Sequence, residues 1–136
     1  MRFMVIVKAT PESEAGALPD AEILAKMGAF NEELVKAGVM LAADGLHTSA
    51  KGARIKFDGP KRTVTDGPFA ETKELIAGYW LIDVKSKEDA IAWMSRAPFD
   101  GGTEIELRQV FELDDFGPAM DDEEPAREAR MRAQLG

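Results

Sequence analysis

Residues 76–82 have the sequence IAGYWLI, a continuous apolar run that decides how the rest of the chain folds. Aromatic and β-branched residues favour a β-strand, and an unbroken apolar run is typical of a central strand with both faces covered. Residues 3–7, FMVIV, have the same character near the start of the chain. We therefore expect two central strands that lie side by side.

Amphipathic helices are expected in two places. Asp20 can cap the first helix, and Gly38 can end it. The second helix begins at Ser86, with Asp89 three residues later as an approximate capping box, and Pro98 lies just beyond its end. Apolar side chains recur at helical spacing in the first helix, which predicts a face that packs on a core. They are Ile23, Leu24, Met27, Phe30, Leu34 and Val35.

The remaining strands are short or alternate between apolar and polar residues. A short strand is expected over residues 39–42. Residues 53–57 and 62–65 alternate on either side of Asp58-Gly59 and predict a β-hairpin. Residues 104–111 also alternate, so that one face packs and the other is polar. The packing face would carry Ile105, Leu107, Gln109 and Phe111, and the other face Glu106, Arg108 and Val110.

The order of elements indicates the fold. With the inserted hairpin set aside, the order is β-α-β-β-α-β, the split βαβ of a ferredoxin-like α+β domain, with an antiparallel sheet and two helices on one face. Central strands that are apolar on both faces need a second cover on the face opposite the helices. We therefore expect a homodimer that packs sheet against sheet, as in dimeric α/β barrels.

The chain divides into a domain over residues 1–113 and an acidic tail over residues 114–136. The tail has seven acidic residues and three arginines, hence a net charge of −4. Pro125 suits a first helical turn, most of the acids precede it and the arginines follow it, as a helix dipole prefers. The same composition is also typical of disorder, so we expect the tail to be either helical or disordered.

Composition limits the classes of function. The 136 residues include no cysteine, which excludes disulfides and thiolate chemistry, and the net charge of −8 disfavours nucleic acid as a partner. The apolar run at residues 3–7 is far shorter than a membrane span of about 20 residues, so we expect a cytoplasmic protein with no membrane partner. One histidine cannot supply a zinc site, no carboxylate spacing indicates another metal, and no motif indicates an organic cofactor.

The loop before residues 76–82 is unusual in length and charge. It is expected to run from Asp66 to about Leu75, longer than most hairpin loops, and extra loop length is often functional. Phe69 can anchor it to the body of the protein, which leaves Glu71, Lys73 and Glu74 available for a ligand. Each Asp-Gly dipeptide of the chain is likewise expected in a loop; they lie at residues 44–45, 58–59, 66–67 and 100–101.

The stretch VTDGPFAETKE at residues 64–74, followed by IAGYWLIDV, resembles the DGPF group of the YCII-related proteins. RFMVIVK, GVMLAADGLHTSAKGARI and EIELRQVFE are similar to the same group in order and spacing, over residues 1–116 in all. The resemblance implies a ferredoxin-like fold assembled into a dimeric α/β barrel. Some YCII relatives act as small dehydrochlorinases or are described as hydrolases with a His-Asp pair, and some DGPF members are encoded beside, or fused to, extracytoplasmic-function sigma factors.

The sequence departs from these relatives in two places. The hydrolase-like branch has its histidine in the first helix, whereas the single histidine here is His47, in the segment after the second strand. The group usually ends its last strand in an EVRP-like sequence, and residues 106–109 here are Glu-Leu-Arg-Gln. Glu106 and Arg108 are therefore kept, and Gln109 replaces the proline.

Histidine is the residue type best suited to proton transfer near neutral pH, so His47 is the candidate general base or acid, with a merely solvated loop histidine as the alternative. Asp66 either closes its own turn or faces a dimer cleft, where it would orient His47 or a ligand. Glu106 and Arg108 lie two residues apart on one strand face, and either pair with each other or line the cleft, where a guanidinium suits a carboxylate or phosphate. Further candidates for ligand binding are Arg54, Lys73, Glu74 and Tyr79.

The preferred interpretation is a homodimer that binds a small polar or anionic organic molecule in a cleft and carries out cofactor-free acid–base chemistry on it. One alternative is a non-catalytic regulatory module that binds a ligand or a protein partner, in connection with a sigma factor. Another is a structural homodimer whose polar loop motifs only stabilise the fold.

Overall fold

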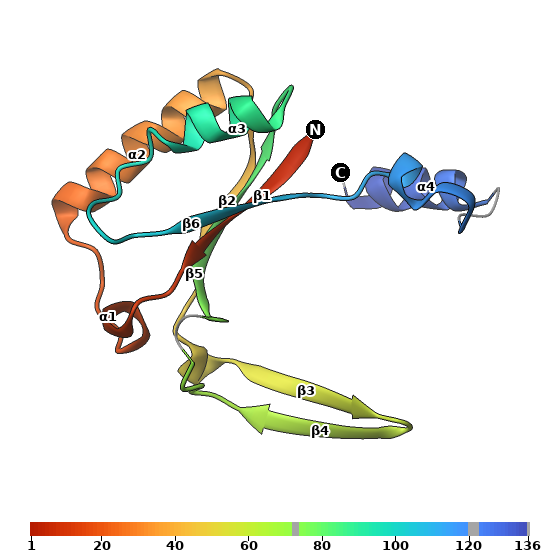
Figure 1. The fold of residues 1–136 in the computed structure, drawn as a ribbon, viewed down its shortest axis with the longest axis horizontal. Coiled ribbons are helices and arrows are strands. Elements are labelled where there is room, and N and C mark those ends of the chain that lie inside the picture. Colours follow the sequence, from red (N-terminus) through yellow and green to blue (C-terminus); the bar gives the residue numbers. More distant parts are fainter. Residues whose placement is uncertain (72–73, 120–122, 136) are drawn as a thin grey trace.

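The computed structural model describes residues 1–71, 74–119 and 123–135. Within these residues a four-stranded antiparallel sheet has the order β2-β5-β1-β6, and helices α2 and α3 cover one of its faces (Figure 1). This arrangement confirms the split βαβ of an α+β fold, with the two apolar runs as central strands. The bounds of these elements are β1 Arg2–Lys8, α2 Ala21–Lys36, β2 Met40–Gly45, β5 Ile76–Asp83, α3 Lys87–Met94 and β6 Ile105–Gln109.

The predicted hairpin is a separate two-stranded sheet inserted between β2 and β5. Its strands are β3, Ala53–Asp58, and β4, Lys61–Asp66, and Gly59 takes a φ of 57° in the turn between them. Short helical segments join the larger elements, and helix α4 follows the sheet. Their bounds are α1 Pro11–Glu14, η1 Ser49–Lys51, η3 Leu113–Ala119 and α4 Glu124–Leu135.

The core lies between the sheet and the two covering helices. Strand alternation points Phe3 and Val5 of β1, with Trp80 and Ile82 of β5, toward the helices, where all four side chains are buried. The ring of Trp80 lies edge-on to Phe30 and to Phe99, and its Nε1 donates to Asn31 Oδ1 at 2.8 Å. The indole therefore fills the core and still has a hydrogen-bond acceptor. The buried helical side chains are Phe30, Leu34, Ala90 and Met94.

The helix ends agree with the predicted caps. The carboxylate of Asp20 accepts from the Ile23 amide at 2.8 Å, and the hydroxyl of Ser86 accepts from the Asp89 amide at 3.1 Å. Gly38, which follows the C-cap of α2, has a φ of 70° that suits glycine. The buried stripe of α2 is narrower than expected, because α2 buries Phe30 and Leu34 and packs Met27 against the core. Its exposed apolar side chains are Ile23, Leu24 and Val35.

Several segments differ from the sequence-based expectations. Asp44-Gly45 is not a loop, because Asp44 pairs with Tyr79 at the end of β2. Residues 11–14 lie outside the two helices expected from the sequence and form a further helix, α1, which Thr10 caps by accepting from the Ser13 amide. Strand β6 ends at Gln109, so Phe111 does not join the packing face. Phe111 is exposed and stacks on Phe116 with ring centroids 5.1 Å apart.

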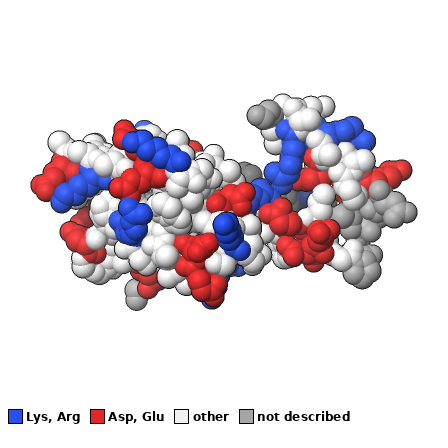
Figure 2. All heavy atoms as spheres, turned by 90° about the horizontal axis from the view of Figure 1, so that it is seen from above, with Lys and Arg blue, Asp and Glu red and all other residues white. Residues whose placement is uncertain are grey.

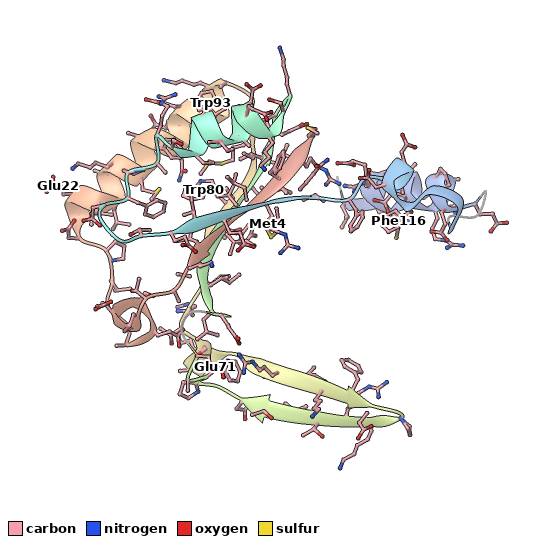
Figure 3. The ribbon with its side chains drawn as sticks, viewed as in Figure 1. Met4, Glu22, Glu71, Trp80, Trp93 and Phe116 are labelled. Atoms are coloured by element: carbon pink, nitrogen blue, oxygen red, sulfur yellow. The ribbon has the colours of Figure 1, made fainter. Side chains whose placement is uncertain are left out.

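Among the residues that the structure describes, none covers the sheet face opposite α2 and α3, and this uncovered face carries half-buried apolar side chains. Figure 3 shows Trp80 on the helix side of the sheet and Met4 on the other. Ile6 of β1 shares the uncovered face with Met4, and Leu81 of β5 pairs with Met4 in register. The hairpin and α4 both extend on this side of the sheet (Figure 1). None of the described helices is long and apolar enough to cross a membrane.

Candidate functional site

A cavity of about 540 Å³ lies at the base of the hairpin, where α1, the segment from β2 to β3 and the segment before β5 meet. Its size falls within the range of pockets that bind small molecules. Charged and hydroxyl side chains share its wall with apolar ones, so it can hold a molecule with both polar and apolar parts. The polar residues are Glu14, His47, Thr48, Ser49, Lys51 and Glu74, and the larger apolar ones are Leu46, Phe69, Leu75 and Ile76.

Close packing of Gly67 against η1 shapes one wall of the cavity. A β-carbon on Gly67 would lie 1.7 Å from the carbonyl oxygen of Ser49, so only glycine allows this approach. The Gly67 amide also donates to the carbonyl of Gly52 at 2.9 Å. The Asp-Gly-Pro turn is therefore a docking element that holds the following loop against residues 49–52.

Ser49 connects three segments of the cavity wall. Its amide and its hydroxyl donate to the two carboxylate oxygens of Glu14, at 2.8 and 2.5 Å, and its hydroxyl oxygen accepts from the Phe69 amide at 2.9 Å. Phe69 is half-buried, and the guanidinium of Arg54 stacks on its ring at 3.9 Å from the centroid. These contacts fix Phe69 in the wall.

The cavity brings together His47 and Glu74, two of the residues predicted to function. His47 is exposed to solvent and lines the cavity, as does Glu74. A hydrogen bond to the Glu71 carboxyl, together with the negative charge of Glu71, raises the pKa of Glu74, while the positive charge of Arg54 acts in the opposite direction. Glu74 therefore keeps its proton to a higher pH than an isolated glutamate does.

A second group of predicted residues lies on the uncovered face of the sheet. The strand register places Asp44, Tyr79, Ile6 and Glu106 in one row across this face. The Tyr79 hydroxyl donates to Asp44 Oδ2 at 2.9 Å, and this hydrogen bond and the negative charge of Asp44 raise the pKa of Tyr79. Since Ile6 separates them, Tyr79 and Glu106 are about 10 Å apart across two strand spacings.

Glu106 has two cationic neighbours. Arg108, which lies on the uncovered face as Glu106 does, places Nη1 3.4 Å from Glu106 Oε2, so the predicted pair forms. Lys8 places Nζ 3.7 Å from Glu106 and 2.8 Å from Glu104. The hydrogen bond to Glu104 raises the pKa of Lys8 and lowers that of Glu104.

The predicted site residues thus form one group at the cavity and another on the uncovered face of the sheet, and two of them belong to neither group. Asp66 is the last residue of β4, pairs with Ala53 in register and does not line the cavity. Lys73 lies outside the described residues. His47 and Glu74 are at the cavity with Arg54 beside Phe69, whereas Tyr79, Glu106 and Arg108 are on the uncovered face of the sheet.

Sequence reasoning missed Glu14, Ser49 and Lys51 as cavity residues. Glu14 and Ser49 are 35 residues apart, and no local pattern signals a contact between them. A sequence feature that does point to this part of the cavity wall is Gly67 in the Asp66-Gly67-Pro68 turn, where the backbone packs too closely against Ser49 of η1 to allow a side chain.

Two further features bear on the chemistry. In the described parts of the chain, no group of three or more His, Asp or Glu side chains converges as metal ligands would. A smaller cavity of about 250 Å³ lies between the end of α3 and β6. Its wall is largely apolar and has Asp100 as an acidic residue, so the larger cavity is the better candidate for acid–base chemistry.

Comparison with known proteins places the chain in a wider group. The family of YCII-related domains matches residues 1–114. An uncharacterised protein of Rhizobium meliloti is 32% identical over 72 residues, which cover 53% of this chain and 58% of that relative. The chain thus matches little more than half the length of this relative.

Among solved structures, 5-chloro-2-hydroxyhydroquinone dehydrochlorinase from Burkholderia phenoliruptrix, in complex with 2,5-dihydroxybenzoquinone, matches 82% of this chain and 96% of its own. The sequence identity is 14% and the TM-score is 0.41.

Proposed function

The chain belongs to the family of YCII-related domains, and from this premise we propose that it binds a small polar or anionic organic molecule in the cavity at the base of the hairpin. On the bound molecule it carries out cofactor-free acid–base chemistry, in which His47 transfers the proton.

The observation that carries the proposal is that His47 and Glu74 line one cavity. A neutral imidazole can accept a proton near neutral pH. Glu74, whose pKa is raised by the hydrogen bond and the charge of Glu71, stays protonated to a higher pH than an isolated glutamate and is suited to donate a proton. Two titratable groups with different environments on one cavity are the arrangement that general acid–base catalysis requires.

The walls of the cavity define the class of molecule. Lys51 in the wall and Arg54 beside Phe69 supply positive charge for a carboxylate or a phenolate. Phe69, Leu75 and Ile76 supply an apolar surface for the rest of the molecule. A small organic acid or a hydroxylated aromatic compound fits both parts.

The assembly in this proposal is a homodimer that packs the uncovered sheet faces together. Met4, Ile6 and Leu81 are apolar side chains on that face, and burial against a second copy would remove them from water. Glu106, Arg108 and Tyr79 would then lie at the interface between the two sheets, where Arg108 is available to a ligand or to the partner.

Binding can be tested with a panel of small carboxylic acids, phenols and their esters, followed by calorimetry and by chemical analysis of each mixture. We expect one class to bind, and His47→Ala and Glu74→Ala to weaken it by about tenfold or more, because each removes a hydrogen-bonding side chain from the cavity wall. Glu104→Ala, which removes a carboxylate outside the cavity, is the matched control and should leave affinity unchanged.

Conversion of the bound compound separates catalysis from regulation. If the proposal is right, the wild-type protein converts it, and His47→Ala abolishes conversion even when binding is saturated. Binding without conversion would favour the regulatory alternative, and equal affinity in all three variants would contradict the site itself.

A further inference from the structure

The β3–β4 hairpin, residues 53–66, has an apolar face that is exposed in a single chain. Every residue of β3 and β4 is exposed. The strand register puts Ile55 opposite Val64 and Phe57 opposite Arg62, so these side chains share one face. Ile55, Phe57 and Val64 are 57%, 68% and 62% exposed. An isolated two-stranded ribbon is at best marginally stable in water, so this face requires a covering surface.

The second exposed apolar surface belongs to the C-terminal arm, which we define as residues 111–135. Phe111 and Phe116 stack on each other there and are 67% and 50% exposed. Figure 3 shows Phe116 on the arm, away from the sheet and from the hairpin. Figure 2 shows the arm as a lobe that stands apart from the body, with acidic and basic side chains on its surface.

Ion pairs hold the start of the arm against the sheet. Arg2 on β1 donates to both carboxylate oxygens of Glu112, at 2.9 and 3.2 Å. Along α4, Arg132 lies 2.7 Å from Glu128. The Arg2–Glu112 pair therefore holds the start of the arm beside β1, and the Arg132–Glu128 pair stabilises α4 itself.

The hairpin and the arm extend from opposite ends of the uncovered face. The hairpin joins the sheet at the end where Ile76 pairs with Lys8, and the arm follows β6 at the end where Gln109 pairs with Phe3. Both extend to the same side of the sheet, away from α2 and α3 (Figure 1). A second copy packed on the uncovered face would therefore lie between them.

The sheet alone provides a small interface. Four strands about 4.8 Å apart and about 20 Å long have a projected area of about 400 Å². A stable interface buries about 800 Å² on each partner. The hairpin and the arm, which flank the sheet face, are the surfaces that can supply the rest.

Two-fold symmetry allows the hairpins and the arms of the two copies to meet in two ways. A two-fold axis that sets the two uncovered faces together lies between them and parallel to the sheets. If the axis runs along the line from hairpin to arm, hairpin meets hairpin and arm meets arm. If the axis is perpendicular to that line, each hairpin meets the partner's arm. Charge decides between them.

The hairpin and the arm have opposite net charges. The hairpin has four basic and two acidic residues, a net charge of +2, and the arm has eight acidic residues and three arginines, a net charge of −5. Two hairpins, or two arms, would repel each other, whereas a hairpin and an arm attract each other. We propose that the apolar face of each hairpin docks on the C-terminal arm of a second copy of this chain, so that Ile55, Phe57 and Val64 contact the partner's surface beside its stacked phenylalanines.

This inference rests on the proposed homodimer and adds that each hairpin pairs with the arm of the partner. Sedimentation equilibrium of the full chain can test it with two sets of charge reversals. The first, on the apolar face of the hairpin, is Arg62→Glu. The second set, in the arm, is Asp114→Lys, Glu123→Lys and Glu128→Lys.

We expect each set alone to raise the dimer dissociation constant by about tenfold or more, and both sets in one chain to restore it. Lys36→Glu, the same change of charge on the helix side, is the control and should have little effect. Phe57→Ser should also weaken the dimer, whereas Thr63→Ala on the opposite face of the hairpin should not. Circular dichroism of every variant verifies that it folds.

The possible outcomes separate this inference from the proposed assembly. A wild-type protein that stays monomeric would overturn the homodimer and this pairing with it. A wild-type dimer whose dissociation constant is unchanged by either set of reversals would overturn the pairing of hairpin with arm alone.

Discussion

A β-carbon on Gly67 would lie 1.7 Å from the carbonyl oxygen of Ser49, closer than any real side chain can approach a backbone atom. Gly67 is the glycine of the Asp66-Gly67-Pro68 turn, and Ser49 begins η1 in the wall of the cavity. The turn and the cavity therefore depend on each other.

Gly67→Ala should destabilise the protein, because backbone atoms of Ser49 would have to move. Overpacking of this kind costs typically about 1–3 kcal/mol. Gly28→Ala is the matched control, since nothing lies within 4 Å of its added β-carbon and alanine in a helix interior gains about 0.5–1 kcal/mol over glycine. Urea unfolding measures both, and an equally stable Gly67→Ala protein would contradict the close packing.

Ser49→Ala should loosen the segment that contains Phe69. The substitution removes the hydroxyl that donates to Glu14 and accepts from the Phe69 amide, and a partly buried amide without an acceptor costs about 1–3 kcal/mol. Hydrogen exchange at the Phe69 amide should become faster, while the Trp80 amide in the core of the sheet should keep its rate. Unchanged exchange at Phe69 would show that Ser49 does not hold this segment.

Glu71→Gln should lower the pKa of Glu74, because it replaces the carboxyl group whose hydrogen bond and negative charge raise that pKa. Since the folded-state pKa is raised, the stability that Glu74 contributes is present below the ordinary glutamate value and is lost as pH rises through the folded value. Glu71→Gln should therefore stabilise the protein near neutral pH and have less effect in acid. Carboxyl NMR measures the titration, and Glu71→Asp, which keeps the charge, should leave the pKa of Glu74 raised.

The pair Arg2–Glu112 should make the arm sensitive to acid. A hydrogen bond from Arg2 lowers the pKa of Glu112, so the stability it contributes is present above the ordinary glutamate value and is lost as pH falls through the folded value. Because the carboxylate is half exposed, Glu112→Gln should cost only about 0.5 kcal/mol at neutral pH. Thermal melts at neutral and acid pH can compare it with wild type, and a cost that persists in acid would contradict this origin.

The fold could be predicted from the sequence because its signals are local. The apolar runs at residues 3–7 and 76–82 form the central strands, and Asp20 and Ser86 cap helices as their positions indicate. The Asp44-Gly45 pair misled the prediction because turn chemistry is a weak preference. Strand pairing with β5 and the hydrogen bond from Tyr79 hold Asp44 in β2 instead.

The candidate site could be predicted only in part, because it forms between segments that are distant in sequence. His47 stood out as the single histidine, but its position in a cavity with Glu74 depends on how η1, α1 and the Gly67 turn pack. Glu14 and Ser49 have ordinary local roles in sequence and meet only in the fold. Tyr79 and Arg108, two of the residues predicted to bind a ligand, lie on the sheet face and not in this cavity.

The ring protons of His47 provide the most direct measurement on the proposed site, because His47 is the single histidine of the chain and its resonances need no assignment among others. Titration with the small carboxylic acids and phenols should move these resonances together with the amides of Phe69 and Leu75, and Glu74→Ala should weaken the response. If every compound that binds leaves the His47 resonances unchanged, or moves only residues of the sheet face such as Tyr79, the cavity is not the binding site.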